Sequence, residues 1–575
     1  MLEFRQLKNN LKKGFSSFPV KRVALLGDSP TQLLNTVIRG YGYENQINFT
    51  VYEADFNQIE MQILNTKSNL YQFNPEFTIV YFSSENLFSS YCKLSFDEQL
   101  NFADTFIEKI NLLNENLLSQ VKTHIIYINF CVLNDNVFGN FANKTPYSFL
   151  FQIRKLNYKL MLLAIKEPKL FVADFDLLQS VYGLSQRKKE STYINTGFVT
   201  DINFIPYLGK QVNDIILSIT GKFKKCLILD LDNTLWGGII GDDGIENIQI
   251  GNLGIGKAFY QFQLWIKQLK QRGIILVVCS KNDEKTAKKP FENHPEMILK
   301  LEDISVFIAN WDNKADNIRY IQSVLSIGFD AMVFIDDNPF ERNLVKRELP
   351  SVSVPDMPND PAEYLKYLQS LNLFETASFS LEDQNRTDKY QEETKRTISK
   401  KSFTNEDDYL ESLLMTIRIE SFNAFTIPRV AQLSQRSNQF NLRTIRYDES
   451  DLLQIIANPN YVTLAVNLID IYGDYGLIGV LVLRKETNSF FIESWLMSCR
   501  VLNRGVEKFV LNKIVALAKQ NKIDELVGEY IETDKNKMVK NHYENLGFKS
   551  FDSQKWSLNV IDYIDFKNYI NEKNE

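Results

Sequence analysis

Residues 224–244 read KKCLILDLDNTLWGGIIGDDG, and this stretch constrains the fold more than any other part of the chain. Its first part contains CLIL, a short apolar run bounded by charge, which is typical of a fully buried parallel strand. Asp230 and Asp232 follow, and two carboxylates two residues apart on extended backbone point to the same side. Like charges held this close repel each other, so the pair requires a cation or a shared proton. One carboxylate can then attack as a nucleophile while the other exchanges a proton with the leaving group.

An isolated D-x-D can also be a strand that ends in a polar turn without any chemistry. The later segments decide between this interpretation and a reactive pair of carboxylates. The run IILVVC precedes Ser280, and the run AMVFI precedes Asp336 and Asp337. Lys314 lies between them in the segment NWDNKADNI. Both runs are short and apolar and read as further buried strands. Their polar ends supply the partners that the first pair of carboxylates lacks.

These segments resemble the four motifs of the haloacid dehalogenase superfamily of phosphotransferases: D-x-D-x-T, then Ser, then Lys, then an Asp pair. The resemblance implies that Asp230 attacks phosphorus and that Asp232 is the general acid and base. Ser280 and Lys314 would hold the phosphoryl oxygens, so that catalysis consists of positioning and charge neutralisation. The resemblance also implies Mg²⁺, a hard cation that prefers oxygen ligands. Its ligands would be the four carboxylates Asp230, Asp232, Asp336 and Asp337.

The spacing of the motifs predicts a minimal cap. The interval between Asp232 and Ser280 is taken up by a glycine-rich flap at 236–256 and one helix ending near Gly273. The interval from Ser280 to Lys314 is shorter still. Neither has room for the large cap domain that encloses small substrates in many members of that superfamily. We therefore expect an open site, suited to a macromolecular substrate or to one delivered on a carrier.

The whole chain is too long, at 575 residues, for one ordinary core. Its 44% apolar and 24% charged residues are typical of soluble globular proteins. The net charge of −6 gives no basic signature for nucleic acid or for anionic membrane. No window approaches a membrane span, and the amino-terminal segment lacks the apolar core of a signal peptide. Five widely spaced cysteines fit a reducing compartment, so we expect a cytoplasmic enzyme without membrane insertion.

The first 215 residues alternate strand and helix patterns, which favours a doubly wound parallel sheet. The strand candidates are KRVALLGDS, NFTVYEADF, EFTIVYFSS and THIIYINF. Gly27, Asp28 and Ser29 resemble the nucleophile block of the SGNH (GDSL-type) hydrolases. A serine hydrolase also needs a base, which that family takes from a late D-x-x-H, and the chain has no such motif here. Only His124 lies in this region, at the start of a strand, so we expect an SGNH-like fold without hydrolysis.

The last part of the chain predicts a third domain. The segment MSCRVLNRGVEKFV reads as strand, tight turn and helix, and a turn that opens a helix offers free N–H groups to a pyrophosphate. It resembles the R-x-x-G-x-G acyl-CoA loop of the GNAT acyltransferases, with Arg500, Arg504 and Gly505 as the implied cofactor-binding residues and Asn503 in place of the first glycine. The later NHYENLGF resembles the GNAT closing motif, in which Tyr543 can protonate a departing thiolate. A GNAT-like fold used only for docking is the alternative.

The predicted architecture is a multi-domain α/β protein. It combines an SGNH-like parallel sheet, a Rossmann-like haloacid dehalogenase core with a minimal cap, and a GNAT-like α+β carboxy-terminal domain. The predicted boundaries are 1–215 for the first domain, 216–373 for the phosphotransferase domain, 374–409 for a charged helical connector and 410–575 for the third domain.

Three segments together, LDLDNTLWGGIIGDDG, RSNQFNLRTIRY and MSCRVLNRGVE, resemble the FkbH-like proteins, a haloacid dehalogenase subgroup of polyketide and polysaccharide pathways. The resemblance implies that 1,3-bisphosphoglycerate, a small acyl phosphate, is captured and dephosphorylated. The glyceryl group would pass through an enzyme thioester to the phosphopantetheine thiol of an acyl carrier protein. Cys499, near a helix amino terminus, and Cys279, beside Ser280, are the candidate thiols. We favour Cys499, because alternation along a buried strand turns Cys279 away from Ser280.

Two other functions remain open from the sequence. The first is a plain magnesium phosphatase that acts on a phosphorylated metabolite or sugar, with the third domain as a scaffold. The second is a non-catalytic assembly protein of a surface-polysaccharide or carrier-protein system. The intact set of predicted phosphotransferase residues argues against the second.

Overall fold

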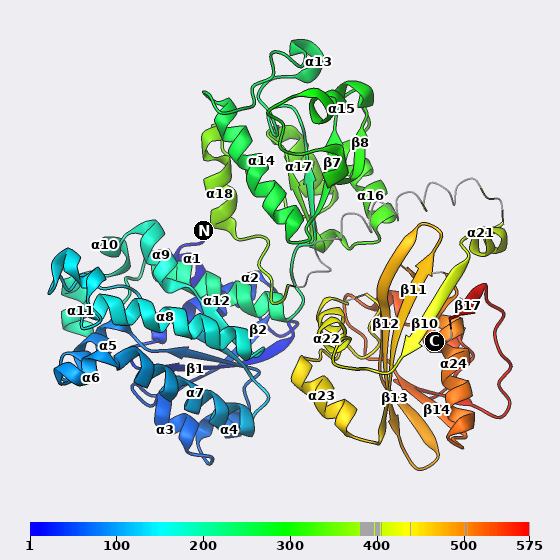
Figure 1. Cartoon of the computed structure of the whole chain (residues 1–575), viewed down its shortest axis with the longest axis horizontal. Helices are drawn as coiled ribbons and strands as arrows, with labels where there is room; N and C mark the ends of the chain where they lie inside the picture. Colours follow the sequence, from blue (N-terminus) through cyan, green and yellow to red (C-terminus); the bar gives the residue numbers. More distant parts are fainter. Residues whose placement is uncertain are drawn as a thin grey trace. The chain divides into compact units, whose positions relative to one another are not determined.

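The structure is a computed structural model that separates into two compact units, Met1–Ser218 and Ile219–Glu575, each described by itself (Figure 1). The residues that it describes are 1–379, 396, 403, 405–437, 439–498, 501–502 and 504–573. In that part of the chain, none of the helices has the length and apolar character needed to cross a bilayer.

The first unit is built on a five-stranded sheet in the order β2-β1-β3-β4-β5, and every neighbouring pair is parallel. Its strands are β1 (Val20–Gly27), β2 (Asn48–Glu53), β3 (Phe77–Tyr81), β4 (His124–Ile128) and β5 (Leu170–Ala173). The first four coincide with the strand candidates of the sequence. β1, β3 and β4 are largely buried, as inner strands of a parallel sheet are, whereas most of β2, at the edge, is half-buried. The predicted doubly wound parallel sheet is therefore confirmed. The short β5 was not anticipated, since half of its four residues are only partly buried.

Helices connect these strands in the alternating order that parallel strands require. They are α1 (Phe4–Asn10), α2 (Gln32–Glu44), α3 (Ile59–Leu64), α4 (Asn69–Phe73), α5 (Ser84–Tyr91), α6 (Phe96–Leu100), α7 (Phe102–Gln120), η1 (Gly139–Lys144), α8 (Phe149–Lys166), α9 (Phe175–Tyr182), α10 (Leu184–Arg187), α11 (Glu190–Thr196) and α12 (Ile205–Ile219).

The Gly-Asp-Ser turn lies at the carboxyl end of β1, and His124 is the only histidine among the residues of the first unit, all of which are described. Ser29 is buried, and within the described part of the chain its hydroxyl has no hydrogen-bonding partner. The carboxylate of Asp28 accepts the backbone N–H of Ser83 at 2.8 Å, and burial raises the pKa of Asp28 to about 6. His124 is the first residue of β4 and stacks on Phe77, the first residue of β3. It therefore lies at the amino edge of the parallel sheet, opposite to Ser29.

The second unit begins with a four-stranded parallel sheet in the order β8-β7-β6-β9. Its strands are β6 (Cys226–Leu229), β7 (Ile275–Ser280), β8 (Ile304–Ala309) and β9 (Met332–Ile335). The helices around it are α13 (Ile240–Asp243), α14 (Gly256–Gln271), α15 (Glu284–Asn293), η2 (Leu301–Asp303), α16 (Lys314–Leu325), η3 (Phe329–Ala331), α17 (Pro339–Glu348), η4 (Pro361–Glu363) and α18 (Tyr364–Leu371).

Alternation along β6 and β7 gives this sheet two cores. Leu227, Leu229 and Val278 pack with residues of α14 and α18 on one face. Cys226 and Cys279 pack with residues of α16 and α17 on the other face. The strand β8 was not anticipated from the sequence. It lies at the edge of the sheet, where Phe307 and Ile308 are only partly buried.

The rest of the second unit is an eight-stranded sheet in the order β15-β16-β14-β13-β12-β11-β10-β17. The strands are β10 (Met415–Glu420), β11 (Tyr461–Asp470), β12 (Gly473–Lys485), β13 (Ser489–Met497), β14 (Glu525–Glu529), β15 (Lys549–Asp552), β16 (Lys555–Asn559) and β17 (Ile570–Glu572). Two neighbouring pairs, β13–β14 and β10–β17, are parallel, and the others are antiparallel. The predicted mixture of α/β and α+β parts is therefore confirmed.

Helices cover both faces of this sheet (Figure 1). They are α21 (Glu406–Ser412), α22 (Ile427–Arg436), α23 (Glu449–Ala457), α24 (Val506–Gln520), η6 (Lys537–Val539) and α25 (His542–Asn545). Residues of α24 belong to one hydrophobic core, and residues of α22 and α23 belong to the other. Most of the predicted connector at 374–409 lies outside the described residues. Arg396 within it is buried rather than solvated, and its guanidinium pairs with Asp470 through two hydrogen bonds of 2.8 Å. The predicted domain boundaries stay predictions.

Candidate active site

The predicted phosphotransferase residues meet at the carboxyl edge of the four-stranded sheet. Asp230 follows the last residue of the central strand β6, Ser280 is the last residue of β7, and Asp336 follows the last residue of β9. Since β6 lies between β7 and β9 and all three run in parallel, their carboxyl ends share one edge. Ligands of open parallel sheets typically bind at this edge. The structure therefore brings together groups that are far apart in the sequence.

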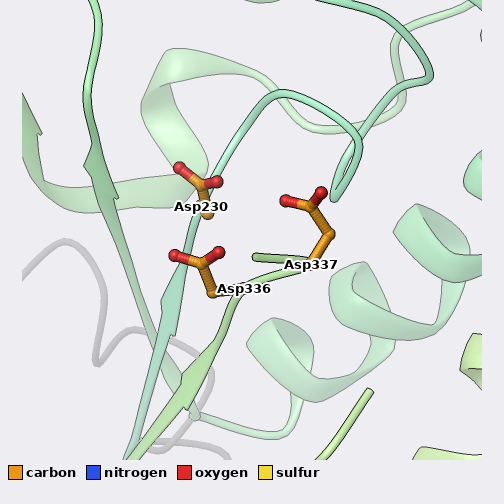
Figure 2. Close-up of side chains that lie close together, drawn as sticks. All are labelled: Asp230, Asp336 and Asp337. Atoms are coloured by element: carbon orange, nitrogen blue, oxygen red, sulfur yellow. The ribbon is translucent and has the colours of Figure 1, made fainter. Parts of the chain in front are cut away.

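Three carboxylates form one cluster at this edge. Oxygens of Asp230, Asp336 and Asp337 lie within 4.8 Å of one another, and Figure 2 shows their carboxylates directed towards one shared space. Lys314, the first residue of α16, is buried beside them. Its Nζ lies 2.9 Å from Oδ1 of Asp230 and 2.6 Å from Oδ2 of Asp336. One ammonium therefore bridges two of the three carboxylates.

The charge of the cluster is not balanced. Burial, followed by the neighbouring Asp230, raises the pKa of Asp336 to about 7, and the same two causes raise the pKa of Asp337. Burial opposes the charged form of Lys314, yet the two carboxylates outweigh it and raise the pKa of its ammonium. Three carboxylates facing one ammonium leave an excess of negative charge in a buried, oxygen-lined space. This donor set fits a hard divalent cation such as Mg²⁺.

Neighbouring residues hold the Asp336–Asp337 turn in place. The backbone N–H of Asp337 donates to Oγ1 of Thr234 at 3.2 Å, which ties the end of β9 to the turn after β6. The guanidinium of Arg342 on α17 donates to the carbonyl oxygens of Asp336 and Asp337 at 2.8 and 2.6 Å. Oδ1 of Asp336 accepts the N–H of Asn338, which is the N-cap of α17. The turn is thereby determined by contacts on both sides.

The carboxylate of Asp232 does not belong to the three-carboxylate cluster. Its Oδ1 accepts the indole N–H of Trp236 at 2.9 Å and the backbone N–H of Ile240 at 3.0 Å. Its Oδ2 accepts the side-chain amide of Asn282 at 2.8 Å. Of the four predicted carboxylate ligands, three therefore form the cluster, while these three donors occupy both side-chain oxygens of Asp232. Burial raises the pKa of this carboxyl, which suits a group that carries a proton.

Sequence reasoning missed Trp236 and Asn282. Trp236 was assigned only to the start of the flap, and Asn282 follows the predicted phosphoryl-binding Ser280 by two residues. The positions alone give no sign that both side chains converge on Asp232. A turn at Asn233, which has a φ of +53°, brings Trp236 back towards the carboxylate. Asparagine favours such left-handed turns, so Asn233 is the local signal that could have suggested the contact between Trp236 and Asp232.

The region around this site contains no separate cap domain. Between Asp232 and Ser280 the chain forms the flap, with the four-residue helix α13, and then α14. Between Ser280 and Lys314 it forms α15, η2 and β8. All residues of these intervals are described, so the minimal cap predicted from the spacing agrees with the structure.

The two strand cysteines near the site are not activated thiols. Cys279 is fully buried on the sheet face opposite to Leu227 and Val278, and its Sγ lies 3.9 Å from the carbonyl oxygen of Lys314. Burial raises the pKa of Cys279 to about 12. Cys226 is buried on the same face. Since a thiolate is the reactive form, neither residue is poised for attack.

The predicted cofactor loop of the third domain is only partly described. Cys499, Arg500 and Asn503 lie outside the described residues. Gly505 is the N-cap of α24 and has a φ of +78°, a left-handed conformation that suits glycine. Arg504 is buried, donates to the hydroxyl of Tyr475 and lies 3.6 Å from the carboxylate of Asp470.

The side chain of Arg504 therefore points into the protein, which differs from its predicted contact with a pyrophosphate. Tyr543 is the predicted acid for a thiolate. Its ring is buried in the core, stacks on Trp556 with centroids 5.6 Å apart and lies against the backbone of Gly528. Burial raises the pKa of its phenol, and its role as an acid stays a prediction. The NHYENLGF segment serves packing in this structure.

Fold and site together define a multi-domain α/β protein with a buried acidic site, suited to a divalent cation, at the edge of a parallel sheet. Residues 22–217 match the family model described as FkbH, N-terminal domain. The N-terminal part of a Bacteroides fragilis protein, containing a phosphatase domain and solved in complex with Mg, is 49% identical to this chain. The match covers 66% of this chain and 100% of the Bacteroides fragilis chain, with a TM-score of 0.64. The chain belongs to the FkbH family.

The other similarities are much weaker. A GNAT-family acetyltransferase from Staphylococcus aureus is 19% identical, with a TM-score of 0.21, and covers 25% of this chain and 99% of that chain. The ribosomal-protein-S18-alanine N-acetyltransferase from Escherichia coli is 12% identical, with a TM-score of 0.20. That match covers 25% of this chain and 94% of the acetyltransferase. Similarities at this level support no functional conclusion. No curated protein matches the chain significantly.

Proposed function

We propose that the chain is an Mg²⁺-dependent phosphatase of the haloacid dehalogenase type that also transfers an acyl group. The observation that carries the phosphatase is the cluster of Asp230, Asp336 and Asp337 bridged by Lys314. The Mg-bound phosphatase domain of the Bacteroides fragilis relative supports the same cation. When bound, Mg²⁺ would be held by these three carboxylates and would neutralise charge on the phosphoryl oxygens.

Each residue of the site has a role that its contacts allow. The Lys314 ammonium lies 2.9 Å from Oδ1 of Asp230, which orients this carboxylate for attack. Attack on phosphorus forms an aspartyl phosphate and breaks the bond from phosphorus to the leaving oxygen. Asp232, fixed by its three donors, gives a proton to that oxygen and then takes one from the water that hydrolyses the aspartyl phosphate. The Ser280 hydroxyl, at the same sheet edge, donates to a phosphoryl oxygen.

The proposed substrate is 1,3-bisphosphoglycerate, and the proposed acceptor is the phosphopantetheine thiol of an acyl carrier protein. The phosphate ester would be hydrolysed at Asp230. The acyl phosphate would react with the Cys499 thiolate, which attacks the acyl carbon and displaces phosphate, and the resulting thioester would pass to the carrier thiol. The family membership and the small flap, which leaves space for a tethered substrate, support this proposal. The burial of Cys279 supports Cys499 as the acyl carrier among the two candidates.

A plain magnesium phosphatase is the second candidate. The positions of Arg504 and Tyr543 favour it, because both side chains point into the protein rather than towards a thiol carrier. In that case the third domain would serve as a scaffold.

The first experiment tests the phosphatase alone. Phosphate release from a general aryl phosphate, which carries no acyl group for Cys499 to accept, is measured for wild type and Asp230→Asn, with Mg²⁺ and with a chelator. We expect release only for wild type with Mg²⁺. Release by the variant above about a tenth of the wild-type rate would contradict the nucleophile, since catalytic nucleophiles contribute orders of magnitude.

The second experiment tests acyl transfer independently of phosphate release. The intact mass of a phosphopantetheine-bearing carrier protein is measured after incubation with enzyme, Mg²⁺ and 1,3-bisphosphoglycerate. A mass increase equal to one glyceryl group supports the transferase. Phosphate release without any increase in mass favours the plain phosphatase.

A further inference from the structure

The outer face of α8 in the first unit carries an apolar surface that the proposed chemistry does not use. The inner face of this helix is buried, with Ile153, Leu156 and Leu160 in the core. The outer face exposes a stripe of large apolar side chains at helical spacing: Phe151, Tyr158, Met161, Leu162 and Ile165. A core helix normally presents polar residues on this side. Contiguous exposed apolar surfaces often mark interaction sites.

The stripe borders a groove rather than a flat surface. A hollow of about 800 Å³ lies along α8 and is lined on its other side by Leu100 and Asn101, where α6 meets α7, and by Asn143 and Pro146 around η1. Phe151, Tyr158 and Leu162 of the stripe line it. We call this hollow the α8 groove. A helix of another protein can fill such a groove, whereas the flat surface of a bilayer cannot.

The side chains that line the α8 groove carry net positive charge, which favours an acidic partner. The helix α8 contains four basic residues and no acidic residue, although the chain as a whole has a net charge of −6. Arg154, Lys155 and Lys159 line the groove itself. Asp104 of α7 lies against the two lysines, 2.5 Å from Lys155 and 2.6 Å from Lys159, and its single charge leaves the groove basic. A basic wall beside apolar side chains is complementary to an acidic amphipathic helix.

We propose that the α8 groove is a docking site for an acidic amphipathic helix of another protein. The apolar face of that helix would lie on Phe151, Tyr158 and Leu162, and its carboxylates would face Arg154 and the two lysines. Symmetric pairing of two copies through this face would put basic α8 against basic α8, which opposes self-association. The proposal concerns the first unit alone and does not depend on the phosphatase activity.

The test uses a synthetic peptide of about 18 residues, which as a helix spans about 27 Å, with leucine on one face and glutamate on the other. Binding of this fluorescently labelled peptide to the full chain is followed by anisotropy. Its control is the same peptide with lysine in place of glutamate. We expect the acidic peptide to bind and the basic peptide not to bind. We also expect the affinity to fall with added salt, as it does for surface charges.

Two variants of the protein locate the site. Ile165 in the stripe and Ile194 in α11 are 79% and 76% exposed, so an aspartate at either position perturbs folding equally little. We expect Ile165→Asp, which puts a carboxylate at the end of the apolar stripe where it repels an acidic helix, to weaken peptide binding about tenfold, and Ile194→Asp to leave it unchanged. Arg154→Glu should also weaken binding and reduce its dependence on salt.

Several results would overturn the proposal. One is equal binding of the acidic and basic peptides, and another is equal loss of binding in the two isoleucine variants. Binding to vesicles containing an anionic lipid, without binding to the peptide, would assign the groove to a membrane surface. A dimer that Ile165→Asp dissociates would assign it to a second copy of the chain. Binding to none of these probes would remove the docking role.

Discussion

Replacing Lys314 by methionine tests the electrostatics of the site directly. Methionine keeps most of the length of the side chain but removes the ammonium that lies 2.6 Å from Asp336 and 2.9 Å from Asp230. All three side chains are almost completely buried, so the carboxylates cannot turn to water for compensation. Breaking a buried ion pair by removing one partner costs about 3–5 kcal/mol, because an uncompensated charge remains. We expect a loss of this size in the free energy of unfolding.

The surface pair of Lys288 and Glu284 provides the matched control. Their charged atoms approach as closely as those of Lys314 and Asp336, yet both side chains are substantially exposed. Exposed pairs contribute about 0–1 kcal/mol, so Lys288→Met should cost at most that much. The difference between the two variants therefore measures burial rather than distance.

Urea unfolding with and without Mg²⁺ is the assay. In Lys314→Met the three carboxylates lack their ammonium, so we expect added Mg²⁺ to stabilise the variant more than it stabilises wild type. A cation at about 100 times its Kd adds about 2.7 kcal/mol to a folded state that alone binds it. If Lys314→Met lowered the free energy of unfolding no more than Lys288→Met does, the reasoning would be refuted. Equal stabilisation of the two proteins by Mg²⁺ would refute it as well.

Four further predictions follow from single contacts. Asn282→Ala should lower kcat about tenfold or more and leave Mg²⁺ affinity unchanged, because the amide contacts Asp232 and not the carboxylate cluster. Ser29→Ala should leave phosphate release unchanged, since no histidine lies at its end of the sheet. Cys499→Ser should abolish loading of a carrier protein and retain phosphate release, because the hydroxyl is a poor nucleophile at neutral pH. His542 is buried with its pKa lowered to about 3, so lowering the pH from 7.5 to 5 should cost roughly 2 kcal/mol of stability, measured by urea unfolding.

The controls for these predictions use other residues of the chain. For Cys499→Ser the control is Cys92→Ser, since Cys92 is an exposed thiol of the first unit and should not affect loading.

For His542 the sign of the pH dependence follows from burial, which favours the neutral ring. The unfolded chain therefore takes up a proton below about pH 6.5 that the folded chain does not. His542→Leu should remove this part of the pH dependence, and an unchanged slope would contradict the assignment. Loss of magnesium affinity in Asn282→Ala, or of phosphate release in Ser29→Ala, would contradict the respective roles.

The strand ends of the phosphotransferase site could be predicted because strong local patterns mark them. The runs before Asp230, Ser280 and Asp336 are apolar and are followed by polar side chains, which identifies both the strands and their active edge. The bridging position of Lys314 depends on how α16 packs against the sheet, and no local pattern contains that information. The sequence similarly could not show that a third donor, Asn282, meets Asp232, because it is 50 residues away in the chain and approaches only in the fold.

The third domain shows the opposite outcome. The segments around Arg504 and Tyr543 match local motifs, yet both side chains are buried in this structure. A motif records residue types and their spacing, and it does not record which way a side chain points. Asp470 and Trp556, which pack against them, come from distant strands. Only tertiary packing therefore decides the environment of the arginine and the tyrosine.

Two of the three donors that fix Asp232 come from one short element. Trp236 and the backbone of Ile240 both belong to the flap, while Asn282 comes from the other side of the site. Displacement of the flap therefore releases the proton-carrying carboxylate from most of its restraints. The local structure of the flap and the orientation of the Asp232 carboxylate are therefore coupled, so a substitution in the flap also changes how this carboxylate is held.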